Sequence, residues 1–252
     1  MRLFTVTPRA VDDWRIVTVP LLNRLSRRSL IATAGIVGLS LSSGYAVAQL
    51  KKGPPPPGEV AVDELMKAGP LPDLALGKDD APVTIVEYAS MTCGHCAAFH
   101  NTVFPKIKEK YVDTGKVRFI LREFPLDNLA AAASMLARCA GGEKTYPLIT
   151  DLFAKQETWA FVQGNPVPAM FQLTQAHGFT KETFDKCLTD QTLLNNITAT
   201  RERANKSFSV RSTPTFFVNG RRLEGPSDRI ETFDKAIEAA SAPAAAAPAQ
   251  KK

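Results

Sequence analysis

A short β-branched run, residues 83–88, ends five residues before the first of two cysteines at positions i and i+3, and this arrangement constrains the fold more than any other feature of the chain. The run is rich in β-branched residues and predicts a buried strand. Residues 94–110 predict a helix that Pro105 interrupts, with Cys93 and Cys96 on its first turn. A strand that leads into such a helix predicts the start of a βαβ unit.

The rest of the chain supplies further strands and a block of helices. Residues 117–122 predict a second strand, and the pattern is helical throughout between residues 127 and 206. After this block come a strand, an Asn-Gly hairpin turn, a short partner strand and an amphipathic closing helix, at residues 215–218, 219–220, 221–224 and 228–240. We therefore predict an α/β sheet with a parallel start and an antiparallel end, and a helical subdomain between its halves.

The length of 252 residues suits one domain with extensions. We place the compact domain at residues 60–240, with its helical insertion at about residues 127–206. Before it, residues 49–59 contain four consecutive prolines and predict a stiff linker. After it, residues 241–252 are mostly Ala and Pro and predict a loose tail.

Residues 1–48 have the features of an export signal. A basic stretch that ends in Arg27 and Arg28 leads into a mildly apolar segment, and Ala46-Val47-Ala48 has the small-x-small pattern of a signal-peptidase site. The arginine pair resembles a twin-arginine signal. An ordinary secretory signal that contains such a pair is the alternative, and an uncleaved signal could also anchor the chain in a membrane.

The net charge of +6 is mostly a property of this first segment, in which six arginines and two aspartates give +4. The remaining residues carry only +2 and show no basic stripe with interleaved aromatics, so the sequence argues against a nucleic-acid partner. No apolar run approaches the roughly 20 residues that a membrane helix usually needs, which excludes a multi-spanning membrane protein.

The predicted helix start gives the first cysteine a special environment. Cys93 faces the unpaired backbone N–H groups of the first turn, and these donors together with the helix dipole favour the thiolate. His95 adds a polar or cationic partner. Lowering the thiol pKa from about 8.5 to about 5 would stabilise the reduced form by about 2.7 kcal/mol at pH 7 and raise the reduction potential by roughly 60 mV. The predicted direction is oxidising.

Other uses of the cysteine pair fit the sequence less well. Haem attachment requires His directly after the second cysteine, but Ala97 stands there. Zinc could use Cys93, Cys96 and His100, but no second pair completes a tetrahedral site. A purely structural disulfide across four residues would be strained and reducible. We therefore expect redox chemistry that needs no organic cofactor and no metal, and we assign His100 only a packing or surface role.

Four features occur in a fixed order along the chain: the strand before Cys-Gly-His-Cys, the segment Arg122-Glu123-Phe124-Pro125-Leu126, the helical insertion, and Thr213-Pro214-Thr215-Phe216. In this combination, over about residues 60–240, the chain resembles the DsbA-type periplasmic thiol:disulfide oxidoreductases of the thioredoxin superfamily. The resemblance implies a thioredoxin-like fold with an inserted all-helical subdomain. A depressed cysteine pKa and an oxidising disulfide are known properties of this family.

The resemblance also implies roles for individual residues. Cys93 would be the exposed nucleophile that forms a mixed disulfide, Cys96 the partly buried resolving thiol, and His95 a residue that tunes the thiolate. Pro214 would be a cis-proline packed against the dithiol, and Thr213 before it would shape contact with the substrate.

Two positions near the dithiol need separate comment. Glu87 lies six residues before Cys93, at the position of the family's buried acid, and is a candidate proton acceptor with a pKa raised by burial. A surface charge on an edge strand is the alternative for Glu87. Gly94 departs from the commonest family pattern, which has Pro, and resembles the eukaryotic disulfide isomerases, so the strength of oxidation stays open.

The other two cysteines, Cys139 and Cys187, lie in the predicted helical block. In an oxidising compartment an even leftover pair suggests a bond, and a subset of the family carries a second, structural disulfide. We predict a disulfide between them; two separately buried thiols are the alternative.

The sequence thus predicts an exported enzyme that introduces disulfide bonds into secreted or periplasmic proteins with free thiols. By resemblance, a DsbB-type membrane quinone reductase would reoxidise it. Residues 49–80 are too short and Pro-rich for the dimerisation domain of the family's isomerases, so we expect a monomer. The alternatives are a disulfide isomerase or reductase kept reduced by a membrane thiol donor, and a non-catalytic metal- or client-binding module.

Overall fold

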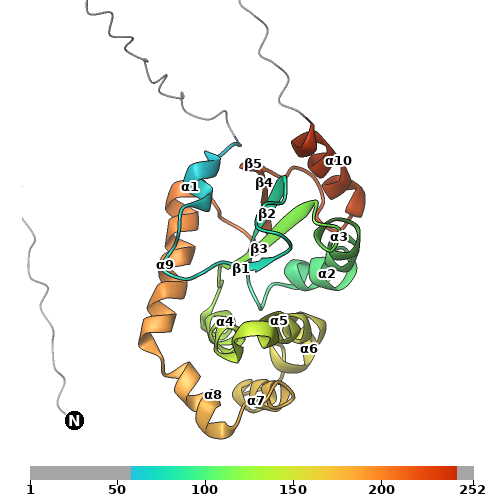
Figure 1. Ribbon diagram of the computed structural model, residues 1–252. Coiled ribbons are helices and arrows are strands. Elements are labelled where there is room, and N and C mark those ends of the chain that lie inside the picture. The colour runs from blue at the N-terminus through green and yellow to red at the C-terminus, as the bar shows by residue number, and fades with distance from the viewer. Residues whose placement is uncertain (1–57, 243–252) are drawn as a thin grey trace, which may run out of the picture. The chain divides into compact units, whose positions relative to one another are not determined.

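The computed structural model describes residues 58–242, which Figure 1 draws in colour. The expected export signal at residues 1–48, most of the Pro-rich linker and nearly all of the tail lie outside the described residues. Those three assignments stay predictions.

The described residues build a five-stranded mixed sheet with the strand order β1-β3-β2-β4-β5. The central strand β2 (Val83–Ala89) pairs in parallel with β3 (Val117–Glu123) and antiparallel with β4 (Thr215–Val218). Short antiparallel strands β1 (Leu74–Leu76) and β5 (Arg221–Arg222) form the two edges. The sheet therefore has the parallel start and antiparallel end that the sequence predicts. Strand β1 was not anticipated, because three residues are too few to show a period.

Helices cover both faces of this sheet. Figure 1 shows α1 (Val62–Met66) and α9 (Gln191–Phe208) on one side and α2 (Gly94–Thr102), α3 (Phe104–Ile107) and α10 (Ile230–Ser241) on the other. Strands β2 and β3 are buried at all but one position each, as expected of parallel strands covered on both faces.

Alternation along β2 decides which layer each of its side chains enters. Val86 and Tyr88 pack in the smaller core cluster, together with Leu65 of α1, while Ile85 packs in the larger one with residues of α2 and α10. Successive side chains of a strand point to opposite faces. Glu87 therefore points to the same face as Ile85, which is the face that α2 covers.

The helix expected over residues 94–110 is divided into α2, α3 and a π-helical turn at Lys108–Val112. Pro105 lies on the first turn of α3. A proline costs little there, because the backbone N–H that it lacks would have no helical partner. The expected interruption is thus present, and the chain restarts the helix at this point.

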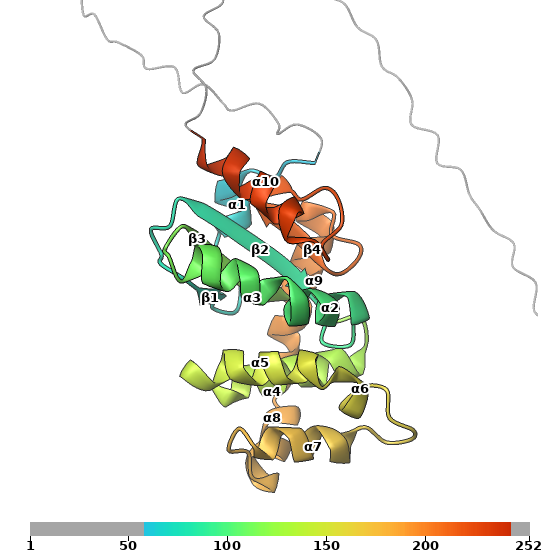
Figure 2. The ribbon, with the colours of Figure 1, turned by 90° about the vertical axis from the view of Figure 1, so that its right-hand side faces the viewer.

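A block of five helices separates β3 from α9: α4 (Asn128–Ala140), α5 (Thr145–Ala154), α6 (Gln156–Trp159), α7 (Val167–Gln175) and α8 (Lys181–Leu188). A 3₁₀ turn at Gly142–Lys144 links α4 to α5, and Figure 2 shows the block beyond one end of the sheet. The structure joins Cys139 of α4 to Cys187 of α8 by a disulfide with an Sγ–Sγ distance of 2.07 Å.

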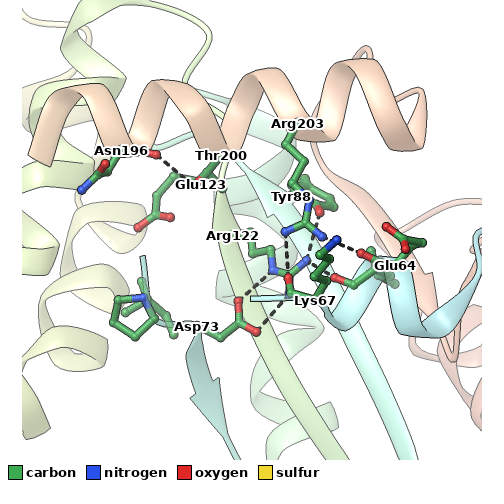
Figure 3. Close-up of polar contacts among 12 residues, drawn as sticks. Glu64, Lys67, Asp73, Tyr88, Arg122, Glu123, Asn196, Thr200 and Arg203 are labelled. Carbon is green, nitrogen blue, oxygen red and sulfur yellow. Dashed lines mark hydrogen bonds and ion pairs between the residues drawn. The ribbon is translucent and has the colours of Figure 1, made fainter. Parts of the chain in front are cut away.

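Buried charges fix the segment before β1 against the sheet (Figure 3). Arg122 of β3 is 6% exposed, and it donates to both carboxylate oxygens of Asp73 at 2.8 and 3.0 Å, to the carbonyl oxygen of Leu65 at 2.6 Å and to the Tyr88 hydroxyl at 3.2 Å. A buried guanidinium needs such partners, because an unpaired buried charge is strongly destabilising. Arg122 begins the Arg-Glu-Phe-Pro segment on which the resemblance rests, and this network gives that arginine a structural reason.

This is the thioredoxin-like fold with an inserted helical subdomain that the sequence predicts. No helix between residues 58 and 242 is both long and apolar enough to cross a membrane.

The Cys139–Cys187 bond closes a loop with a sequence separation of 48 residues, so we expect its removal to destabilise the protein. In the chain-entropy model, losing a cross-link of this length lowers the free energy of unfolding by about 4 kcal/mol. Urea unfolding of a Cys139→Ala/Cys187→Ala variant, compared with the parent chain, measures this difference. An unchanged unfolding midpoint and slope would contradict the expectation.

Candidate active site

The two remaining cysteines lie at the start of α2, just beyond the end of the central strand. Cys93 is the N-cap residue, with an extended backbone of φ −84° and ψ 117°, and its N–H donates to the carbonyl oxygen of Ser90 at 3.1 Å. Cys93 is 9% exposed and Cys96 0%. Another molecule can therefore reach only the first sulfur.

The surroundings of Cys93 favour its thiolate. They lower the pKa of the Cys93 thiol to about 5, chiefly through a hydrogen bond from the Cys96 thiol. Burial opposes this change, and the Thr213 side chain and the backbone N–H groups of Cys96 and His95 add to it. Because the helix has no residues before Cys93 to accept from these N–H groups, they are free to donate to the sulfur.

Cys96 has the opposite character. Burial is the first cause that raises the pKa of its thiol well above the ordinary value, and the hydrogen bond to Cys93 and the negative charge of Glu87 raise it further. At neutral pH the site therefore holds a thiolate at Cys93 and a thiol at Cys96.

The loop before β4 brings Thr213 and Pro214 to the dithiol. The Thr213–Pro214 peptide bond is cis, and the Cys93 sulfur lies 3.3 Å from the Thr213 carbonyl oxygen, to which it donates when it carries a proton. These residues are 120 positions apart in the chain. They meet because β4 lies antiparallel to β2, so that the start of β4 adjoins the end of β2.

Glu87 is fully buried on β2, opposite Leu121 and Phe216 on the neighbouring strands. One of its carboxylate oxygens, Oε2, lies 2.8 Å from Nε2 of His100, which is 6% exposed. From the sequence we expected only a packing or surface role for His100, so this contact with Glu87 is new. The spacing of His100 from Cys96 was the available signal, since residues four apart lie on one face of a helix.

Gln156 is a second site residue that the sequence does not indicate. Its side-chain amide Nε2 donates to the carbonyl oxygens of Met91 at 2.8 Å and Cys93 at 3.2 Å, and the residue is 4% exposed. It begins α6, in the helical insertion. No local pattern could have indicated this contact, because more than 60 residues separate the partners.

The two residues between the cysteines are exposed. The contribution of His95 to the lowered pKa of Cys93 comes from its backbone N–H. A Cβ atom at Gly94 would meet nothing within 4 Å, so neither packing nor backbone conformation demands a glycine at this position.

Within residues 58–242, no group of three or more His, Cys, Asp or Glu side chains is arranged to hold a metal ion. His100, which zinc binding would require, contacts Glu87 instead.

We expect the ultraviolet absorbance of the thiolate in the reduced protein to titrate with a midpoint near pH 5. An unfolded thiol has a pKa of about 8.5, so the folded pKa is the lower one. The resulting stabilisation of the reduced fold is complete above about pH 8.5, amounts to about 3 kcal/mol at pH 7 and is lost as the pH falls through about 5. Below about pH 8, the change with pH of the difference in unfolding free energy between the reduced and disulfide forms measures it. Titrating groups common to both forms cancel in this comparison, and the Cys96 thiol, whose pKa is raised in the fold, stays protonated. A midpoint near that of a free thiol would refute this expectation.

Replacement of Gln156 by Ala removes the donor to two buried carbonyl oxygens. We expect a loss of about 1–3 kcal/mol of unfolding free energy, the cost of unsatisfied buried polar groups. Gln172→Ala, at an exposed position of α7 in the same insertion, is the matched control and should leave stability nearly unchanged. Equal urea midpoints for the two variants would show that the Gln156 contacts contribute nothing.

Comparison with known proteins agrees with this geometry. A family model described as thioredoxin matches residues 71–239. A Rickettsia bellii protein whose name describes a protein-disulfide oxidoreductase is 37% identical over 168 residues, which cover 66% of this chain and 65% of that protein. The chain thus spans less than two thirds of the length of that relative, and it covers 61% of a similarly named protein of Rickettsia prowazekii.

Solved structures of two other proteins are similar to this chain. The crystal structure of Wolbachia pipientis alpha-DsbA1 is similar with a TM-score of 0.65 and 30% identity, covering 72% of this chain and 96% of that one. The crystal structure of oxidised BdbD from Bacillus subtilis is similar with a TM-score of 0.59 and 22% identity, and the match covers 73% of this chain and 96% of BdbD. This likeness supports the assignment of the fold. With its cysteine pair at the start of α2 and its helical insertion, the chain belongs to the thioredoxin family and is of the DsbA type.

Proposed function

We propose that the protein is an exported thiol:disulfide oxidoreductase that transfers its Cys93–Cys96 disulfide to newly translocated proteins with free thiols. The observation that carries this proposal is the difference between the two sulfurs, of which one is reachable with a pKa of about 5 and the other is buried with a raised pKa. A stabilised thiolate favours the reduced form of the enzyme. The disulfide form is therefore a strong oxidant of other thiols.

The transfer takes place in two exchange steps. A thiolate of the client attacks the Cys93 sulfur, a bond forms between the client and Cys93, and the Cys96 sulfur leaves and takes up a proton. A second client thiolate then attacks the client sulfur of this mixed disulfide and releases the Cys93 thiolate. Two electrons pass from the client to the enzyme, and the client gains one disulfide.

The surrounding residues support these steps. The low pKa makes Cys93 a good leaving group in the second step. Glu87 is the candidate proton donor and acceptor for Cys96, because its charge acts on that thiol and one of its oxygens has no partner among the described residues. Thr213 and Pro214 lie at the reactive sulfur, where backbone groups beside the cis bond could pair with a client chain.

Two large apolar side chains near the dithiol favour unfolded clients. Leu126 is 49% exposed, and the next residue, Asp127, accepts a hydrogen bond of 2.7 Å from Thr92 beside Cys93. Phe161 is 52% exposed and follows α6, whose Gln156 contacts Cys93. Exposed apolar groups of this kind suit extended chains that have not yet buried their own hydrophobic residues.

The cellular setting rests on sequence and resemblance. The signal-like features of residues 1–48 support export to the periplasm. A membrane quinone reductase of the DsbB type would reoxidise the dithiol, and the chain would act as a monomer. These parts of the proposal are separate from the chemistry of the cysteine pair.

The decisive experiment is the equilibrium of the Cys93–Cys96 pair with glutathione. We expect a reduction potential closer to about −120 mV than to about −270 mV, the values of oxidising and reducing members of the superfamily. A reduction potential near about −270 mV would contradict the assignment as an oxidase and favour a reductase or isomerase.

Variants of the two cysteines test the order of attack. Cys93→Ser should abolish disulfide transfer to a reduced peptide with two cysteines. Cys96→Ser is first treated with glutathione disulfide, which joins Cys93 to one glutathione and releases the other. A reduced peptide with one cysteine should then displace the bound glutathione and stay joined to Cys93, which mass spectrometry detects. A parent chain that transfers no disulfide but binds the reduced peptide as well as Cys93→Ser does would indicate a binding module without thiol chemistry.

A further inference from the structure

Glu87 of β2 and His100 of α2 form a buried polar pair in the core. Both side chains are almost completely buried, at 0% and 3% exposure, and Oε2 of Glu87 lies 2.8 Å from Nε2 of His100. The other carboxylate oxygen of Glu87, Oε1, is buried with no hydrogen-bond partner in the described structure. Buried polar atoms nearly always have a partner, so an unpartnered one needs a reason.

The position of the pair relative to the dithiol follows from helix geometry. His100 comes four residues after Cys96 on α2, and residues at this spacing lie one above the other on the same helix face. Both residues are buried on the side of α2 that packs toward the sheet. Glu87 enters from β2 beneath this face, binds His100 and acts on the Cys96 thiol by its charge.

Aromatic rings hold the imidazole in place. The His100 ring is stacked on Phe153 of α5, with centroids 4.3 Å apart and an interplanar angle of 12°. The ring centroids of Phe104 of α3 and Phe119 of β3 lie 5.0 and 6.5 Å from that of His100. The ring therefore has little freedom to turn away from Glu87.

Most other ionisable groups on the elements around the pair have partners elsewhere or are exposed. Tyr146 of α5 is influenced by the charge of Glu87, but burial is the main cause of its raised pKa, and its hydroxyl donates to the Leu74 carbonyl oxygen at 2.8 Å. Others bind in ion pairs: Arg118 with Asp79, Arg122 with Asp73, Glu123 with Arg138, Lys110 with Asp234, and Asp151 with Lys155 and His177. Lys106 and Glu109 are exposed. Cys96 is a redox group on which the charge of Glu87 acts.

We propose that His100 is a positioning residue of the dithiol site, which holds Glu87 by Oε2 and so leaves Oε1 free to exchange a proton with Cys96. The inference rests on the proposed function, since it concerns the closing and opening of the Cys93–Cys96 bond. Without the imidazole, the carboxylate would lose the one hydrogen bond that it makes within residues 58–242, and a buried carboxylate without a hydrogen bond is disfavoured relative to its neutral form. Fewer molecules would then hold Glu87 in the form that accepts the Cys96 proton.

The step that depends on proton transfer from Cys96 to Glu87 is the formation of the Cys93–Cys96 disulfide, which we call ring closure. The Cys93 thiolate of the reduced enzyme first attacks glutathione disulfide and releases one glutathione thiolate. The Cys96 thiol then gives its proton to Glu87 and attacks the Cys93 sulfur, the bond between Cys93 and glutathione breaks, and the second glutathione leaves as a thiolate. The enzyme dithiol loses two electrons and glutathione disulfide gains them.

The test measures the rate of ring closure against pH in the full chain, by acid quench and mass spectrometry of the glutathione mixed disulfide. His100→Leu removes the donor, whereas His100→Gln keeps an amide N–H that can reach Oε2. Both variants lose the stacked ring, so the difference between them reports the hydrogen bond alone. We expect His100→Leu to close about tenfold more slowly at neutral pH and its pH midpoint to move up by about one unit, with His100→Gln close to the parent chain.

A double variant shows whether His100 acts through Glu87. Glu87→Gln should slow closure by about 100-fold, and adding His100→Leu to it should cause no further loss. If His100→Leu does not fold, His100→Asn, whose amide is too short to reach Oε2, takes its place with the same expected result.

The outcomes separate the two proposals. If the parent chain does not form its disulfide with glutathione disulfide, the proposed function is overturned. If the parent chain closes but His100→Leu and His100→Gln share its rate and pH profile, or if the two substitutions are additive in the double variant, the role of His100 is overturned and the proposed function stands.

Discussion

The chemistry of this protein depends on the packing of one face of α2 against the central strand of the sheet. That contact leaves Cys93 at the helix mouth, where backbone N–H groups and the Thr213 loop reach its sulfur, and encloses Cys96 among apolar side chains. Two chemically identical thiols thereby acquire opposite preferences for the proton. A looser contact would admit water to Cys96 and reduce the difference, because its raised pKa depends first on burial.

The buried polar groups of the core differ in how completely they are hydrogen-bonded. Most structural charges are paired, as Arg122 is with Asp73 and with the carbonyl oxygen of Leu65. Among the described residues, Nε of Arg118 and of Arg201 is buried without a hydrogen bond. Glu87 is a buried carboxylate that has one partner and one oxygen without a hydrogen bond within residues 58–242, in a setting where unpaired polar atoms are costly. An incompletely satisfied group of this kind is more readily explained by proton transfer than by stability.

The helical insertion does more than enlarge the domain. Its helix α6 carries Gln156, whose amide donates to the carbonyl oxygens of Met91 and Cys93 in the turn before α2. Its helix α5 carries Phe153, which stacks on His100. The Cys139–Cys187 disulfide joins α4 to α8 within the same block. Because the insertion contacts both the turn and the buried pair, the geometry of the dithiol depends on residues far from it in the chain.

Local sequence determined the elements and the reactive group. The β-branched run of β2, the cysteine pair at a helix start and the Asn-Gly turn each depend on contacts within a few residues, so they could be recognised without a structure. Only tertiary structure decided that His100 binds Glu87 and that the Gln156 amide binds the Cys93 carbonyl oxygen. The same holds for the Thr213 carbonyl oxygen, which lies beside the Cys93 sulfur. Periodicity does not encode such contacts, because strand order and helix packing set which distant side chains meet.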